Sequence, residues 1–169
     1  MGRPEVPQVG TERELLLAHL EHARATFRRK CEGLTAEQLR STPTASSLSL
    51  AGLLKHLAFV EWWWFRTNLR GDPPHPVFAE VDWRADPDWE FRTAVDDDPE
   101  TLFDLLDECV TAAREAVAEC DSLEHVAAQE RHGGAVTLRW ILLHMLDEVA
   151  RHNGHADIIR ESIDGAVGY

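Results

Sequence analysis

The side chains best suited to chemistry lie close together near the carboxyl end of the chain. The segment is His144-Met-Leu-Asp-Glu148-Val-Ala-Arg-His152-Asn-Gly-His155. If it is helical, His144, Glu148 and His152 fall at positions i, i+4 and i+8 and project from one stripe. Successive members of this stripe are roughly 6 Å apart at Cβ, which allows two side chains to share a metal ion. The spacing therefore predicts a metal-binding helix face.

A third ligand must come from a facing helix, and His56 is the strongest candidate. It interrupts the apolar run Leu-Leu-Lys-His-Leu-Ala-Phe, although a histidine in such a place is more often a hydrogen-bonded core residue. If the two helices are antiparallel with flush ends, His56 lies level with residues 150–156. This register favours Glu148 and His152 as its partners and leaves His144 a turn or more away.

The other histidines of the stripe have less defined roles. His144 and His152 are ~12 Å apart along a helix axis, so they cannot bind one ion together. Three roles stay open for His155: a hydrogen-bond partner that orients a ligand histidine, a substrate contact, or an alternative ligand. The competing interpretation is a polar stripe on a solvated helix, with no metal. We predict that His56, Glu148 and His152 bind the ion and that Glu148 is also the catalytic residue.

Helix-start signals place these residues on long helices. The expected N-caps are Thr11, Thr35, Ser49, Asp98 and Thr137. Thr11 and Thr35 open capping boxes, and Asp98 is followed by a proline at the first helical position. The long helices are expected to span residues 12–33, 50–68, 99–120 and 138–163, with a short helical turn after Thr35.

The connection over residues 71–98 contains four of the eight prolines and reads as irregular. Loops this long in compact domains tend to be functional or disordered. Its aromatic residues Trp83, Trp89 and Phe91 predict that it packs onto the body of the protein.

The run Trp62–Trp64 cannot face the core with all three rings. At least one of them should line a cleft, pack under the long connection or lie in a dimer interface.

These elements predict an all-α fold. Four helices of about 20 to 27 residues are each ~30 to 40 Å long, which favours a four-helix bundle. The long crossover between the second and third helices gives an expected up-down-down-up order. At 169 residues, the chain is expected to form a single domain over 1–169, with a flexible N-terminus over 1–10.

Composition excludes several classes of partner. The formal net charge of −13 opposes binding to nucleic acid, because phosphate backbones are held by clustered Lys and Arg. The chain contains no run of about 18 apolar residues, the length that could span a membrane. Its N-terminus also lacks an apolar signal core, so a cytoplasmic location is expected. Cys31, Cys109 and Cys120 form no paired motif and are expected to be free thiols.

Two motifs resemble the DinB/YfiT-like superfamily of four-helix-bundle metalloenzymes. Its members share a histidine in a leucine-rich second helix, similar to Leu-Leu-Lys-His56-Leu, and the motif H-x3-H-x3-H in the fourth helix. Here the motif becomes His144-x3-Glu148-x3-His152, and the resemblance implies that His56, Glu148 and His152 bind the metal. The two-His, one-Glu set is similar to that of mycothiol-dependent maleylpyruvate isomerase. That enzyme has an additional C-terminal domain, so we do not expect isomerase activity here.

The resemblance implies a transferase of a low-molecular-weight thiol such as mycothiol or bacillithiol. Coordination would deprotonate the thiol, and the thiolate would attack an electrophilic carbon of a small-molecule substrate. Two alternatives stay open. One is a metal-dependent hydrolase that uses metal-bound water as the nucleophile. The other is a non-catalytic binding or assembly bundle with a degenerate metal site.

The expected metal is a divalent ion, with zinc first and nickel, iron or manganese as alternatives for similar ligands. Family members are often homodimers, and a homodimer is the expected assembly. The arginines that could meet an acidic substrate are Arg66, Arg139, Arg151 and Arg160. We expect surface salt bridges to be their main role.

Overall fold

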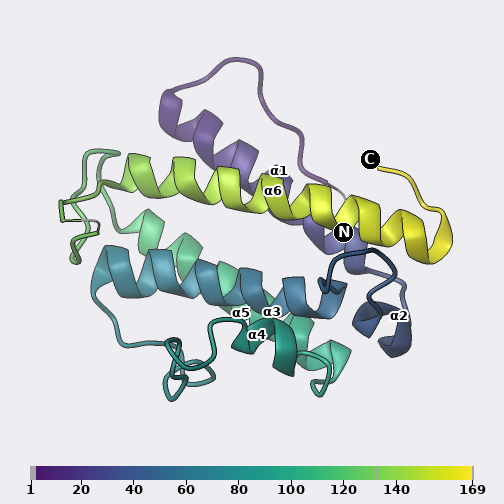
Figure 1. Ribbon diagram of the computed structural model, residues 1–169. Helices are drawn as coiled ribbons and strands as arrows, with labels where there is room; N and C mark the ends of the chain where they lie inside the picture. Colours follow the sequence, from purple (N-terminus) through teal and green to yellow (C-terminus); the bar gives the residue numbers. More distant parts are fainter. Residues whose placement is uncertain (1–2, 132, 169) are drawn as a thin grey trace.

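The computed structural model describes residues 3–131 and 133–168, and this part of the chain is all-helical, with no β-strand (Figure 1). Residues 3–10 contain no helix and run back along the first long helix, where the carbonyl of Pro4 bonds the ring of His22 at 2.9 Å. The helices, in chain order, are α1 (Glu12–Cys31), α2 (Ala36–Arg40), α3 (Leu50–Glu61), the π-helix η1 (Trp62–Arg70), α4 (Trp89–Thr93), α5 (Pro99–Ala118) and α6 (Leu138–Asp164).

The predicted helix starts are confirmed. Thr11 and Thr35 each complete a capping box, in which side chain and backbone satisfy each other's hydrogen bonds. The hydroxyls of Ser49 and Thr137 accept backbone N–H bonds at the starts of α3 and α6. Asp98 occupies the N-cap position before α5, but its side chain makes no capping hydrogen bond.

The structure corrects the sequence-based prediction at two places. The second long helix changes from α to π geometry at Trp62. Within the π-helical part, the side-chain amide of Asn68 donates to the carbonyl of Trp63 at 2.6 Å. Gly71 ends it with a φ of 79°, a left-handed conformation that glycine adopts without strain. The connection predicted to be irregular contains α4. A five-residue helix cannot be stable alone, so its sequence carries little signal.

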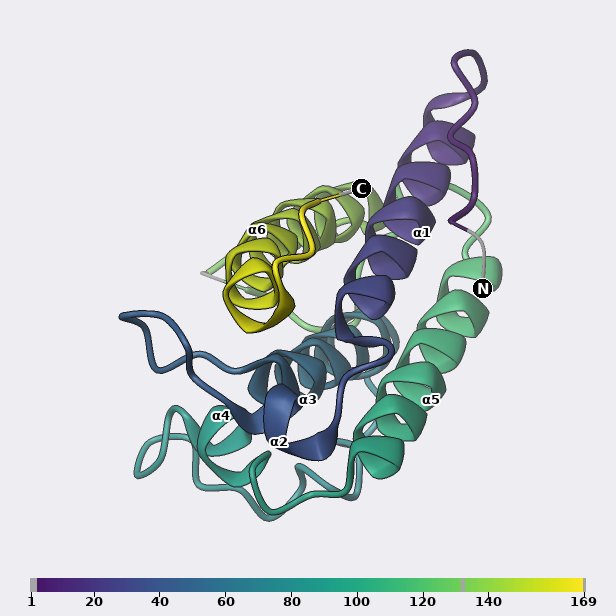
Figure 2. The same cartoon turned by 90° about the vertical axis from the view of Figure 1, so that its right-hand side faces the viewer.

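The long helices pack in pairs, α1 along α6 and α3 along α5 (Figures 1 and 2). Contacts between α1 and α6 advance together along both helices, joining Glu12 to Arg139, Ala23 to Asn153 and Lys30 to Arg160. These two helices therefore run in the same direction.

The segment formed by α3 and η1 runs opposite to α6. His56 on α3 meets Glu148, whereas Trp64, further along the segment, meets His144, which is earlier on α6. The antiparallel pairing assumed in the sequence analysis is thus present. It sets the register that brings histidines from two helices together.

The core lies between these helices. Trp83, Trp89 and Phe91 from the long connection pack against it, as predicted. All three cysteines are buried free thiols, and burial raises the pKa of Cys31 and Cys109 far above the usual range of a thiol. They are therefore unsuited to act as nucleophiles. Among the described helices, none combines the length and apolar character needed to cross a bilayer.

Candidate metal centre

The antiparallel helices α3 and α6 bring His56, Glu148 and His152 together. One carboxylate oxygen, Oε1 of Glu148, lies 3.0 Å from Nε2 of His56 and 3.1 Å from Nε2 of His152. The side chains are 15%, 14% and 10% exposed, respectively. The site is thus mostly enclosed but reachable from solvent.

The three donor atoms suit a divalent ion. Donors bound at about 2.1 Å around a tetrahedral ion lie roughly 3.4 Å from one another. In this structure the ligand atoms of His56, Glu148 and His152 all lie within 4.8 Å of one another. Two imidazoles and one carboxylate also make a donor set that zinc and related ions accept, with coordination positions left for other ligands.

The environment of His56 makes its ring basic. Nδ1 lies 2.9 Å from the carboxylate of Glu90, and Nε2 faces Glu148, so the ring can donate to both only when protonated. Burial alone would lower the pKa of His56, but the hydrogen bonds to Glu148 and Glu90 outweigh it and raise the pKa above its usual value. A metal ion would take the place of the Nε2 proton, while Nδ1–H would still donate to Glu90.

Glu90 is a residue of the candidate site that the sequence analysis missed. It lies on α4 and is only 3% exposed. A carboxylate that accepts the second N–H of a ligand histidine fixes the ring's orientation and tautomer. The only local sign was an acidic residue between two aromatics, Trp89 and Phe91. Nothing in the sequence indicates that this residue reaches a histidine 34 positions earlier in the chain.

Three contacts hold α4 against α3. A Cβ on Gly52 would lie 3.1 Å from the ring of Phe91, so glycine allows this close approach. The ring of Phe91 stacks on His56 with centroids 4.8 Å apart. The buried ammonium of Lys55 donates to the hydroxyl of Thr93 at 2.9 Å and lies over the ring of Trp89. Together these contacts place Glu90 beside His56.

The other two histidines of the stripe have separate surroundings. Nδ1 of His155 lies 3.3 Å from Nδ1 of His152, so His155 is a partner of a candidate ligand. His144 stacks on Trp140 at 5.2 Å and packs against Trp64 at 4.5 Å. Desolvation lowers the pKa of both His144 and His155, which keeps their rings neutral at pH 7.

The four candidate arginines are engaged in salt bridges, as predicted. The pairs are Arg66–Asp72 at 2.8 Å, Arg139–Glu12 at 2.9 Å, Arg151–Asp147 at 2.7 Å and Arg160–Asp164 at 2.9 Å. Arg151 is the one nearest the site, 4.0 Å from the outer oxygen of Glu148.

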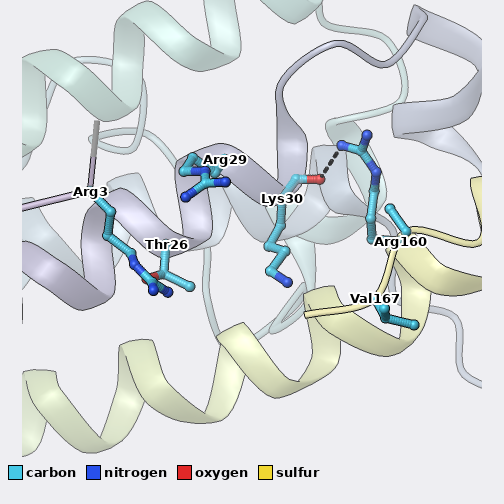
Figure 3. Close-up of a pocket in the computed structure, with 7 residues that line it drawn as sticks. Arg3, Thr26, Arg29, Lys30, Arg160 and Val167 are labelled. Carbon is cyan, nitrogen blue, oxygen red and sulfur yellow. Dashed lines mark hydrogen bonds between the residues drawn. The ribbon is translucent and has the colours of Figure 1, made fainter. Parts of the chain in front are cut away.

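A basic cavity of about 180 Å³ lies between α1 and the carboxyl end of α6 (Figure 3). It is lined in part by Arg3, Arg29, Lys30 and Arg160. The ammonium of Lys30 pairs with Asp157, and Arg160 donates to the carbonyl of Lys30 at 3.0 Å. None of the three candidate ligands lines this cavity, so it is separate from the metal centre.

The fold and the site define a class, an all-helical protein with a His/Glu/His group able to hold a divalent ion, as in the DinB/YfiT-like superfamily. The chain belongs to the mycothiol-S-transferase family, whose model matches residues 15–165. This match confirms the resemblance drawn from the sequence. A conserved protein from Enterococcus faecalis has a similar solved structure, with a TM-score of 0.71 and 17% identity over 94% of this chain and 100% of that chain. That likeness concerns the fold alone. No curated protein matches the sequence.

Proposed function

We propose that this protein is a divalent-metal-dependent transferase of a low-molecular-weight thiol of the mycothiol or bacillithiol type. The observation that carries the proposal is the group of donor atoms from His56, Glu148 and His152, all within 4.8 Å of one another, in a chain of this family. The substrate is a small molecule with an electrophilic carbon. In the transfer, the thiol loses its proton to solvent, its sulfur forms a bond to that carbon, and the bond from the carbon to its leaving group breaks, so that the leaving group departs with the electron pair, as chloride does from a chloromethyl compound.

Each residue of the site has a distinct part in this proposal. His56 and His152 supply neutral nitrogens, and Glu148 supplies a negative charge that offsets the charge of the ion. An ion held there would favour the ionised form of a thiol sulfur. Glu90 accepts the outer proton of His56 and fixes its ring. Phe91 covers one face of the same ring and keeps water from it.

The proposal includes several finer features of the molecule. The fold is an up-down-down-up four-helix bundle, whose helices are α1, the continuous segment of α3 and η1, α5 and α6. Zinc is the native ion, the protein is a homodimer and it acts in the cytoplasm. Light scattering after size-exclusion chromatography tests the dimer directly, since a monomeric mass of 19.1 kDa would contradict it.

A transfer assay with matched variants tests the function. The zinc-loaded protein is mixed with mycothiol and monochlorobimane, and formation of the fluorescent thioether is followed. We expect Glu148→Gln to lose at least ~100-fold in rate, because the ligand charge is removed. Asp147→Asn, the adjacent exposed carboxylate, should keep the wild-type rate.

The outcomes of this assay separate the candidate functions. A metal-dependent rate that needs the thiol supports the transferase. Metal-dependent cleavage of an activated ester with no thiol present would support the hydrolase instead. A protein that binds no metal and shows neither reaction would be a non-catalytic bundle.

A further inference from the structure

A small cavity lined by aromatic rings lies under the long connection, apart from the metal centre. Its volume is about 130 Å³. The rings that line it come from α3, η1 and the connection, and belong to Phe59, Trp62, Trp63, His75, Phe78 and Trp83. We call this the aromatic cage. Two of the three consecutive tryptophans, Trp62 and Trp63, are partly buried, pack against the core and also line this cage.

The rings of the aromatic cage meet at different angles rather than forming one stack. Phe59 is central, with Trp83 stacked on it at 4.3 Å and Phe78 edge-on at 5.2 Å and 70°. Trp62 meets His75 edge-on at 4.7 Å. An arrangement of this kind surrounds a volume with several π-systems, whose faces carry negative potential.

The one titratable side chain among these rings, His75, has a hydrogen-bond partner at each ring nitrogen. Nδ1 of His75 accepts the backbone N–H of Val77 at 3.2 Å. Nε2 of His75 lies 3.3 Å from Glu108 and can donate its proton there. Among the residues that the structure describes, no Asp, Glu, Lys or Arg side chain lines the cage. Glu108 adds negative charge on the outer side of His75.

Neighbouring contacts show that these tryptophans already attract cations. The guanidinium of Arg66 lies 5.6 Å from the ring centre of Trp62, and that of Arg131 lies 5.6 Å from the ring centre of Trp63. Inside the cage, no carboxylate is available to strip a strongly hydrated ion of its water. A weakly hydrated organic cation suits such a site best, because its charge interacts with ring faces while its methyl groups fill an apolar volume.

We propose that the aromatic cage binds a quaternary ammonium group of trimethylammonium size. The volume of about 130 Å³ is about four times the ~30 Å³ that a water molecule occupies in the liquid, close to the space of five heavy atoms. The formal net charge of −13 favours the approach of cations to the protein. This inference is independent of thiol transfer and needs no metal.

Choline and its neutral isostere 3,3-dimethylbutan-1-ol test the proposal, because they differ in charge but hardly in shape. Both are titrated into the metal-free protein, and binding is followed by tryptophan fluorescence and by chemical shifts of the indole N–H groups. We expect choline to bind at least ~10-fold more tightly than the alcohol. Equal affinity would overturn the proposal, since the cavity would then select only for shape. No binding of choline up to ~100 mM would overturn it as well.

Variants locate the binding site. Trp83→Leu and Phe59→Leu should each weaken choline binding at least ~10-fold, because each removes a ring from the cage. Trp140→Leu, which removes a partly exposed tryptophan of α6 outside the cage, should leave it unchanged. Circular dichroism confirms that each variant is folded before it is titrated. Undiminished choline binding in both folded cage variants would place the site elsewhere and overturn the proposal.

Discussion

Glu148 is held between two imidazoles that share one of its oxygens. Hydrogen bonds from His152 and His56 lower the pKa of its carboxyl far below the usual range, although burial opposes the shift. The carboxylate is therefore charged throughout the neutral range. Its charge explains both how two histidines are kept close together and why a cation would be accepted there.

Zinc binding should depend on pH through His56. Because hydrogen bonds to Glu148 and Glu90 raise the pKa of His56, the ring holds a proton that zinc must displace. We expect the affinity to rise about tenfold per pH unit below this pKa, which lies above 6.5, and to level off above it. Isothermal titration calorimetry between pH 5.5 and 8.5 measures both the affinity and the proton release. An affinity independent of pH over this range would contradict the role given to His56.

Glu90 should matter for the metal although it does not touch it. We expect Glu90→Ala to weaken zinc binding ~10- to 100-fold at pH 8, because Nδ1–H of His56 loses its acceptor. Glu90→Gln keeps an accepting oxygen and should lose less. Zinc affinity is measured by competition with a chelating dye, and Glu80→Ala, in the same connection but exposed, is the control. Equal affinities in Glu90→Ala and Glu80→Ala would show that Glu90 does not support the site.

Between elements, a buried ion pair joins α1 to the end of α3. Arg24 donates to Glu61 at 2.7 and 2.5 Å, and Glu61 is 1% exposed. We expect Arg24→Met to lower the free energy of unfolding by about 3 kcal/mol or more, because it leaves a buried carboxylate unpaired. Arg28→Met breaks the exposed pair with Asp107 and should cost less than about 1 kcal/mol. Urea unfolding followed by circular dichroism compares the two, and similar losses would contradict this explanation.

Much of the element layout was predictable from local chemistry. A helix start needs an N-cap oxygen or a proline at the first position, and these signals at Thr11, Ser49, Asp98 and Thr137 are local in sequence. The grouping of His56 with α6 followed from one further assumption, that the two helices are antiparallel. Helix spacing then fixed which residues of the stripe lie level with it.

The features that were missed depend on tertiary packing. In the π-helix η1, backbone hydrogen bonds join residues five positions apart instead of four, and nothing in its composition indicates this. Glu90 acquires its role only when α4 docks on α3, where Gly52 admits the ring of Phe91. Since α4 has five residues, neither its formation nor its position can be read from periodicity.

For the whole molecule, a bound ion would link two helices that are distant in sequence. His56 and Glu148 are 92 positions apart, so the unfolded chain does not present the site. Free zinc at 100 times its dissociation constant should stabilise the fold by ~2.7 kcal/mol. Thermal unfolding should therefore shift upward with zinc and return to its original midpoint with EDTA. His152→Ala should show no shift, and an equal shift in this variant would mean that zinc binds elsewhere.

The most direct test of the metal centre is the metal content of the purified protein. Elemental analysis is applied to the wild type, His152→Ala and the control Asp147→Asn, each after incubation with zinc and gel filtration. The proposed site predicts about one equivalent of metal in the wild type and in Asp147→Asn, and a loss of most of it in His152→Ala. Wild-type protein that retains no metal after incubation with zinc, nickel or ferrous iron would contradict the account, and the transferase proposal would fall with it.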